Sequence, residues 1–400
     1  MLTHARLLLA LAALTLPACG AVSHAVPGSA GPARTTSDNA SALPGDNASA
    51  LPGDNASALP GDNASALPGA SLACAPPATG SAACTVALNL SVAPLSDPNT
   101  AAALIPGFHP DDLRAAYRLP DAPGGTVAAV VAYDAPAVES DLAVYRAAFG
   151  MAPCTSTTGC LRVLNQRGGA APPAPDAGWA REAALDLEMI SAACPRCRIV
   201  LVEADSSRLD DLGAAVDTAA NVGAVAIGNS YYADEWAAQG GEDAHYHHPG
   251  VLLTAASGDR PKPSYPAVVP EVIAVGGTSL QAGTWAQTSW PNAGGGCSAY
   301  VARPRWQPLR PCGAQRAAVD VAVVGNPQTG VAMYNAASGG WFVVGGTSVG
   351  APLVAAAHAL SGNPAIPGFA YAHPAAFADV APAGFDAITG LGSPLGVAGL

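Results

Sequence analysis

The sequence predicts an α/β fold in which helices cover both faces of a mainly parallel sheet. Between residues 108 and 360, apolar runs of strand length alternate with segments that have helical spacing. The apolar runs are continuous rather than alternating with polar residues, which is typical of strands buried on both faces. Alternation of such strands with helices indicates parallel connections.

Each expected element has a local reason. The run at 125–132 is β-branched and bounded by glycines, and Pro110 with two following aspartates marks a helix start. We expect strands at 125–132, 198–203, 223–227, 251–255, 271–275 and 341–344, and helices at 109–117, 140–148, 179–190, 208–221 and 353–360.

Composition limits the classes of function. The 400 residues carry a net charge of −12, and Lys262 is the only lysine. A protein with this negative charge would be repelled by a polyanion, so nucleic-acid binding is not expected. No motif indicates an organic cofactor, and we expect a monomer.

The N-terminus resembles an export signal. Arg6 precedes an apolar run at 7–16, which is too short to span a bilayer but suits a signal peptide over 1–18. The following Cys19 lies in a sequence similar to a bacterial lipobox, so its lipidation and simple secretion both remain open. An anchor-proximal segment at 19–37 would lead into a linker at 38–69, where an octapeptide rich in Pro and Gly repeats four times. We expect the protein to be exported, with any membrane contact made only through Cys19.

The sequence contains nine cysteines, and eight remain if Cys19 carries a lipid. Eight cysteines in an exported chain indicate disulfides and allow 105 pairings. We favour pairing of sequence neighbours, and Cys194 with Cys197 could instead form a redox or metal-binding dithiol. The favoured pairs are Cys74–Cys84, Cys154–Cys160, Cys194–Cys197 and Cys297–Cys312.

Ser348 lies at a predicted junction between a strand and a helix. Gly345 and Gly346 permit a sharp turn, and Pro352 suits a first helical turn. We expect an exposed hydroxyl near the positive end of the helix, which suits a nucleophile. A plain serine N-cap is the alternative.

Three carboxylates, two on one predicted helix and one after a predicted strand, are candidates for catalysis. Glu182 and Asp186 are four residues apart, so they share one face of the predicted helix, whereas Glu188 points elsewhere. Two carboxyls in a low-dielectric site tend to share one proton, which makes Glu182 a candidate base and Asp186 its orienting partner. Asp259 follows a predicted strand and could, when protonated, donate to an oxyanion. A solvated acidic face and an ordinary turn aspartate are the respective alternatives.

These motifs together resemble the serine-carboxyl peptidases, or sedolisins, from about Phe108 to Pro394. The resemblance includes Glu182-x-x-x-Asp186, Ser257-Gly258-Asp259 and Gly346-Thr347-Ser348, in this order. It implies a subtilisin-like three-layer fold for a peptidase domain at 107–400, after a Cys-bounded transition at 70–106. It also implies Ser348 as nucleophile, Glu182 as base, Asp186 as its partner, Asp259 as oxyanion donor and a polypeptide substrate cleaved at acidic pH.

The resemblance further implies a calcium site, although the loop concerned is shorter here than in relatives. Its ligands would come from Asp379, Val380, Gly384 and Asp386, with Pro382 as a further carbonyl. Two other departures are the lack of a long N-terminal propeptide and Tyr232 at a position where the family has glycine.

Three rival interpretations remain open. One is a histidine triad, with Asp134 as its aspartate, although no histidine lies in the helix that carries Glu182. Another is a zinc site at His245, His247 and His248, although these histidines do not belong to a carboxylate-containing zinc motif such as HExxH. The third is a catalytically silent surface lipoprotein that binds a peptide or a partner in the same cleft.

Overall fold

The computed structural model describes residues 69–380 and 384–400. The expected signal peptide, Cys19, the anchor-proximal segment and the linker up to residue 68 lie outside the described residues. Within the described ranges, no helix combines the length and the apolar character needed to cross a membrane.

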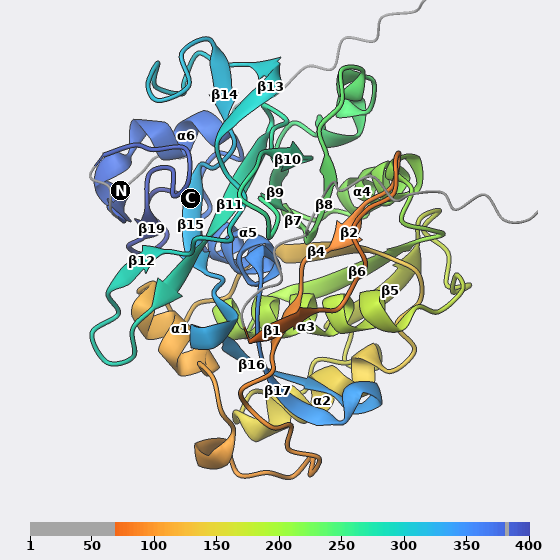
Figure 1. Ribbon diagram of the computed structural model, residues 1–400. Coiled ribbons are helices and arrows are strands. Elements are labelled where there is room, and N and C mark those ends of the chain that lie inside the picture. The colour runs from red at the N-terminus through yellow and green to blue at the C-terminus, as the bar shows by residue number, and fades with distance from the viewer. Residues whose placement is uncertain (1–68, 381–383) are drawn as a thin grey trace, which may run out of the picture. The chain divides into compact units, whose positions relative to one another are not determined.

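An eight-stranded sheet forms the centre of the described fold (Figure 1). Its order is β12-β11-β9-β7-β4-β6-β5, with β15 also paired to β11. All pairs are parallel except β11–β12, as the continuous apolar runs predicted. The strands are β4 (Thr126–Ala132), β5 (Leu161–Asn165), β6 (Arg198–Ala204), β7 (Ala226–Asn229), β9 (Leu252–Ala256), β11 (Val272–Leu280), β12 (Gln287–Ser289) and β15 (Val321–Val324).

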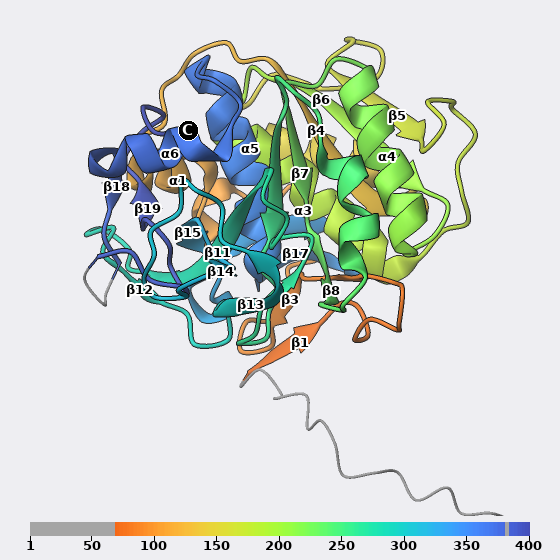
Figure 2. The ribbon, with the colours of Figure 1, turned by 90° about the horizontal axis from the view of Figure 1, so that it is seen from above.

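Helices cover both faces of this sheet. Helices α3 and α5 pack against each other on one face, and α4 lies on the other (Figure 2). The described α-helices are α1 (Pro110–Ala116), α2 (Val138–Ala148), α3 (Ala177–Ala193), α4 (Leu209–Asn221), α5 (Gly350–Ser361) and α6 (Pro367–Ala372). The predicted α/β class with a mainly parallel, doubly covered sheet is confirmed.

Two small antiparallel sheets join the N-terminal part of the described chain to strands from its later parts. One has the order β1-β3-β17-β16 and the other β10-β8-β2. Their strands are β1 (Ala70–Leu72), β2 (Ala83–Cys84), β3 (Ala87–Asn89), β8 (Tyr231–Asp234), β10 (Ser264–Tyr265), β16 (Val331–Asn335) and β17 (Gly340–Gly345). β2 and β3 therefore pair with strands that lie more than 100 positions later in the chain, whereas β1 pairs with β3.

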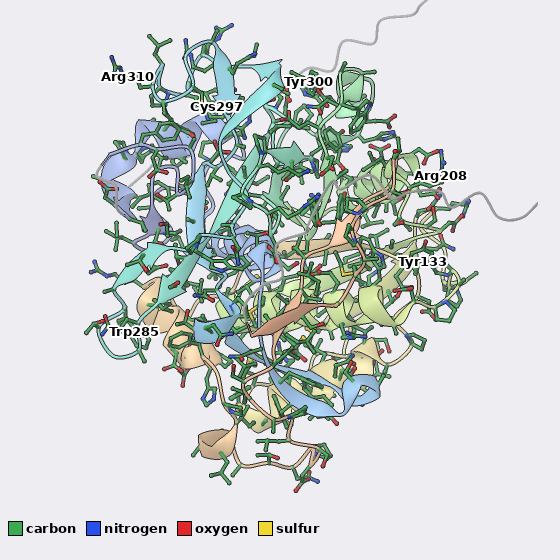
Figure 3. The ribbon with its side chains drawn as sticks, in the orientation of Figure 1. Tyr133, Arg208, Trp285, Cys297, Tyr300 and Arg310 are labelled. Atoms are coloured by element: carbon green, nitrogen blue, oxygen red, sulfur yellow. A yellow bond between two sulfur atoms is a disulfide. The ribbon has the colours of Figure 1, made fainter. Side chains whose placement is uncertain are left out.

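Two further hairpins are β13 (Cys297–Ala302) with β14 (Gln315–Ala317), and β18 (Phe377–Ala378) with β19 (Ser393–Pro394). Figure 3 marks Cys297 at the start of β13, where the Cys297–Cys312 disulfide closes the hairpin. All four predicted neighbour pairings are confirmed as disulfides. Cys194 and Cys197 are thus a disulfide rather than a free dithiol.

The strand predicted at 271–275 continues to Leu280 in β11, and the strand predicted at 223–227 is shifted toward later residues. The strand there begins only at Ala226, because Gly223 has a φ of 90° and lies in the turn that follows α4. The strand predicted at 341–344 is confirmed within β17, but it belongs to an antiparallel sheet beside the main one.

Candidate active site

Ser348 lies in the predicted turn between a strand and a helix. β17 ends at Gly345, a short 3-10 turn covers Thr347–Val349, and α5 begins at Gly350. Gly346 has a φ of 103°, which favours glycine and sets the direction of the turn. The expectation of an exposed Ser348 hydroxyl is wrong, because Ser348 is 0% exposed and its Oγ is hydrogen-bonded to Thr85 Oγ1.

Helix α3 brings Glu182 and Asp186 to this turn, and both carboxyls are fully buried. Asp176 caps the helix by accepting hydrogen bonds from the backbone N–H groups of Gly178 and Trp179. Glu188 points elsewhere, as predicted, and accepts a hydrogen bond of 3.1 Å from the Tyr334 N–H.

The Glu182 carboxyl faces backbone donors rather than water. Its Oε2 accepts hydrogen bonds from the Thr85 N–H at 2.8 Å and the Val86 N–H at 3.0 Å. Burial raises the pKa of Glu182 well above its usual range, while the Ser348 hydroxyl and these two N–H groups oppose the rise. Glu182 Oε1 has no hydrogen-bond partner in the described part of the chain.

Asp186 is held by a serine from a neighbouring strand. The Ser230 hydroxyl, which follows β7, donates to Asp186 Oδ1 at 2.5 Å. Burial and the charge of Glu182 raise the pKa of Asp186, and the Ser230 hydrogen bond opposes them. Asp186 Oδ2, like Glu182 Oε1, lacks a partner among the described residues. Two such oxygens on coupled carboxyls can hold one proton between them.

Asp259 follows β9 and reaches the residue next to Ser348. Its Oδ1 accepts hydrogen bonds from the Thr347 N–H at 2.8 Å and the Thr347 Oγ1 at 2.9 Å. Its Oδ2 is buried without a partner among the described residues. Burial raises the pKa of Asp259 to about 7, despite the lowering effect of the Thr347 bonds. At mildly acidic pH the carboxyl is therefore neutral and can donate.

The structure thus brings the four predicted residues Glu182, Asp186, Asp259 and Ser348 to one buried polar centre. Sequence reasoning missed Thr85, Val86 and Thr347, which contact three of the four. Thr347 adjoins Ser348 in the chain, so its place in the turn was the available signal. Thr85 and Val86 carry no local signal, because only pairing with distant strands places them here.

Tyr232, which stands at the family's glycine position, is 3% exposed. Arg260 lies 4.8 Å above its ring, and a side chain at Gly258 would meet the same ring at 3.4 Å. The ring therefore fills the space against Gly258, the residue that precedes Asp259.

The described histidines do not reach this centre. His245 and His248 are hydrogen-bonded to Asp217 at 2.7 and 3.0 Å. His358 is buried on α5 and lacks a hydrogen bond to Ser348, Glu182 or Asp186 in the described structure. The described residues also contain no cluster of three or more His, Cys, Asp or Glu side chains suited to a metal.

The Asp379, Val380 and Asp386 oxygens predicted to bind calcium accept hydrogen bonds from neighbouring groups. Asp386 accepts hydrogen bonds from the Ile388 and Thr389 N–H groups and from the Thr389 hydroxyl. Val380 O accepts from the same hydroxyl at 3.1 Å, and Asp379 Oδ2 accepts from the Gly384 N–H at 2.5 Å. Calcium requires six or more oxygens, and these described oxygens already have donors, so they fit the ion poorly. Pro382 lies outside the described residues.

The architecture agrees with a solved peptidase structure. A Pseudomonas sedolisin, a serine-carboxyl proteinase complexed with pseudo-iodotyrostatin, matches 72% of this chain and 96% of its own at 22% identity and a TM-score of 0.64. Fervidolysin from Fervidobacterium pennivorans matches 68% of this chain and 42% of its own at 17% identity and a TM-score of 0.45. No protein-family model and no curated protein matches the sequence. The likeness to the Pseudomonas structure confirms the predicted subtilisin-like fold.

Proposed function

We propose that this chain is a serine-type endopeptidase that uses carboxyls where other serine peptidases use histidine. The observation that carries this proposal is the location of Ser348 among three buried carboxyls with raised pKa values, while no described histidine reaches it. Ser348 is the nucleophile, Glu182 the general base, Asp186 its partner and Asp259 the oxyanion donor.

The chemistry follows from these positions. Glu182 accepts the proton of Ser348 as the hydroxyl attacks a peptide carbonyl. Asp259, held through Oδ1 by Thr347, donates from Oδ2 to the developing oxyanion. Glu182 then transfers the proton to the leaving amine, and water hydrolyses the resulting ester by the reverse route.

The carboxyl chemistry predicts activity at acidic pH. Asp259 donates only when it is protonated, so activity should fall as the pH rises through the pKa of about 7. Ser230 positions Asp186 and would keep the shared proton near Glu182.

The test is hydrolysis of an unstructured protein between pH 3 and 7. We expect activity that is highest in acid and is lost in Ser348→Ala and Glu182→Gln. Glu188→Gln is the matched control, because Glu188 is buried on the same helix but contacts Tyr334. Activity that survives Glu182→Gln would contradict the assigned base.

A second candidate is a catalytically silent protein that binds a peptide or a partner at this centre. The complete burial of Ser348 and the filled space at Tyr232 favour it. A folded chain that neither hydrolyses protein nor reacts at Ser348 with an aldehyde or fluorophosphonate probe would support this candidate.

The proposal places the protein outside the cytoplasm. Four disulfides are typical of an oxidising compartment. Lipid attachment at Cys19 is tested by the mass of the mature N-terminus and by extraction into detergent, with Cys19→Ser as control.

A further inference from the structure

The hairpin of β13 and β14, with the loop between them, exposes both arginines and apolar side chains. We call the exposed residues Tyr300, Arg305, Leu309 and Arg310 the hairpin patch. Tyr300 and Leu309 are 51% and 63% exposed, and both arginines are exposed as well. Figure 3 shows Tyr300 and Arg310 at the edge of the described domain. The patch therefore combines positive charge with apolar surface.

The charge of this part of the chain differs from that of the rest. The whole chain has a net charge of −12, but residues 272–319 contain four arginines and no aspartate or glutamate. Arg316 is buried and paired with Asp320, and Arg303 donates hydrogen bonds to carbonyls of the loop. Arg305 and Arg310 are the two that remain exposed. The negative net charge thus hides a local positive surface.

Arg305 and Arg310 lack an acidic partner, unlike several other arginines of the described chain. Elsewhere, arginines contact aspartates in the pairs Arg114–Asp111, Arg167–Asp205, Arg208–Asp210 and Arg260–Asp234. Within the described residues, the side chains of Arg305 and Arg310 make neither an ion pair nor a hydrogen bond. Their charges are therefore available to an anionic partner.

Contacts at the base of the hairpin hold the loop in place. The Cys297–Cys312 disulfide closes it, and the rings of Trp306 and Tyr371 pack with their centroids 4.7 Å apart. The buried Gln307 side chain accepts a hydrogen bond of 2.7 Å from the Ala317 N–H and donates one of 3.0 Å to the Ala317 carbonyl. A loop that is anchored in this way and still exposes Leu309 and Tyr300 indicates a surface that contacts a partner.

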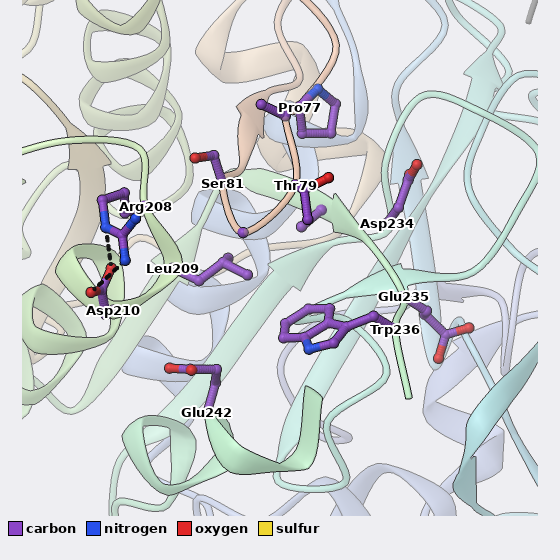
Figure 4. Close-up of a pocket in the computed structure, with 13 residues that line it drawn as sticks. Pro77, Thr79, Ser81, Arg208, Leu209, Asp210, Asp234, Glu235, Trp236 and Glu242 are labelled. Atoms are coloured by element: carbon purple, nitrogen blue, oxygen red, sulfur yellow. Dashed lines mark hydrogen bonds and ion pairs between the residues drawn. The ribbon is translucent and has the colours of Figure 1, made fainter. Parts of the chain in front are cut away.

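The positive surface ends at Ser298, where acidic side chains begin. The Ser298 hydroxyl donates to Glu235, which lines a cavity of about 400 Å³ (Figure 4). The lining of this cavity carries one arginine and four carboxylates, those of Asp210, Asp234, Glu235 and Glu242. An anionic surface would be repelled by these carboxylates and attracted by the patch. The charges therefore determine which side of the domain approaches such a surface.

We propose that the hairpin patch binds the surface of a membrane that contains anionic lipids. The two arginines bind lipid phosphates, and Tyr300 and Leu309 enter the headgroup region, where tyrosine is enriched in membrane proteins. An acidic peptide fits less well, because extended peptides usually add to a regular strand edge. The register of β13 on β14 shifts between Cys297 and Ala302, and three prolines interrupt the loop. This inference goes beyond the proposed peptidase function and does not depend on it.

The patch would be a membrane contact in addition to any lipid on Cys19, the only contact expected from the sequence. Two arginines and two apolar side chains bind weakly by themselves, and a single lipid chain commonly needs a second contact for stable attachment. The hairpin begins beside the candidate active site, because the Gly294 N–H donates to the carbonyl of Gly258, which precedes Asp259. Attachment through the patch would therefore hold the site close to the lipid surface.

The experiment is cosedimentation of the full chain with phosphatidylcholine vesicles, either pure or with about 30% phosphatidylglycerol as the anionic lipid. The chain carries Cys19→Ser and Ser348→Ala, so that neither a lipid nor peptidase activity contributes. We expect binding that requires phosphatidylglycerol and weakens when the salt concentration rises from about 50 to about 500 mM. Arg305→Gln and Arg310→Gln should each weaken binding about fivefold, and Leu309→Ser should weaken it at low and high salt alike.

Two exposed residues outside the hairpin provide matched controls. Arg162 lies on β5 in the main sheet, and Leu104 is 71% exposed in a short 3-10 turn. Arg162→Gln and Leu104→Ser should bind vesicles as the parent does. All these positions are exposed, so the variants should fold, which circular dichroism checks.

Three results would overturn the inference. The first is a lack of binding to the phosphatidylglycerol vesicles, and the second is an equal loss of binding in the control and patch variants. The third is binding to polyglutamate, lost in the patch variants, without binding to vesicles, which would show that the patch recognises an acidic polypeptide instead. None of these results bears on Ser348, so the proposed peptidase function is tested separately.

Discussion

The protonation of Asp259 gives a prediction that does not require any catalytic assay. Burial raises the pKa of this carboxyl from 3.8 to about 7, while the Thr347 donors partly offset that rise. The folded chain therefore binds this proton more tightly than the unfolded chain. The resulting stability is fully present below about pH 3.8 and is lost as the pH rises through about 7. At about 1.4 kcal/mol per pH unit, the whole effect is about 4 kcal/mol.

Asp259→Asn should remove this dependence while keeping the local geometry. The asparagine Oδ1 can still accept from Thr347, and its amide nitrogen takes the place of the protonated Oδ2. We expect the variant and the parent to have similar free energies of unfolding at pH 4. At pH 8 the variant should be more stable by up to about 4 kcal/mol.

The assay is urea unfolding followed by tryptophan fluorescence at pH 4, 6 and 8. Both chains carry Ser348→Ala so that self-digestion does not interfere. Asp121→Asn, at an exposed aspartate, is the control for loss of a charge. Equal pH dependence in parent and Asp259→Asn would show that Asp259 is ionised in the folded chain. An ionised carboxyl cannot donate to an oxyanion, so that result would refute its assigned role.

Two further predictions concern other carboxyls. Burial raises the pKa of the 1% exposed Glu203 from 4.5 to about 7. The folded chain therefore binds this proton more tightly than the unfolded chain, and the resulting stability is lost as the pH rises through that range. Glu203→Gln should gain about 3 kcal/mol over the parent between pH 4 and pH 9, measured by the same unfolding assay. Because the described oxygens of the calcium site that the resemblance implies already accept hydrogen bonds, we expect EDTA to leave the Tm unchanged. A fall of several degrees on EDTA treatment that added calcium reverses would instead establish the ion.

Local geometry explains which parts of the site could be predicted. Glu182 and Asp186 were predictable because a four-residue spacing places both on one helix face whatever the helix packs against. Ser348 was predictable because glycines, an apolar strand and an Ala-rich helix are adjacent in the chain. The order of the main-sheet strands is not local, and the continuous apolar runs indicated only that the sheet is parallel.

The position of residues 82–86 over Ser348 could not be predicted for the same reason. Thr85 lies 263 positions before Ser348, and β2 has only two residues, too few for a periodic pattern. The position of β2 depends on β8, which pairs with β10 along one edge and with β2 along the other. The incorrect expectation of an exposed Ser348 hydroxyl follows directly, because the covering residues come from a segment interpreted as a transition before the domain.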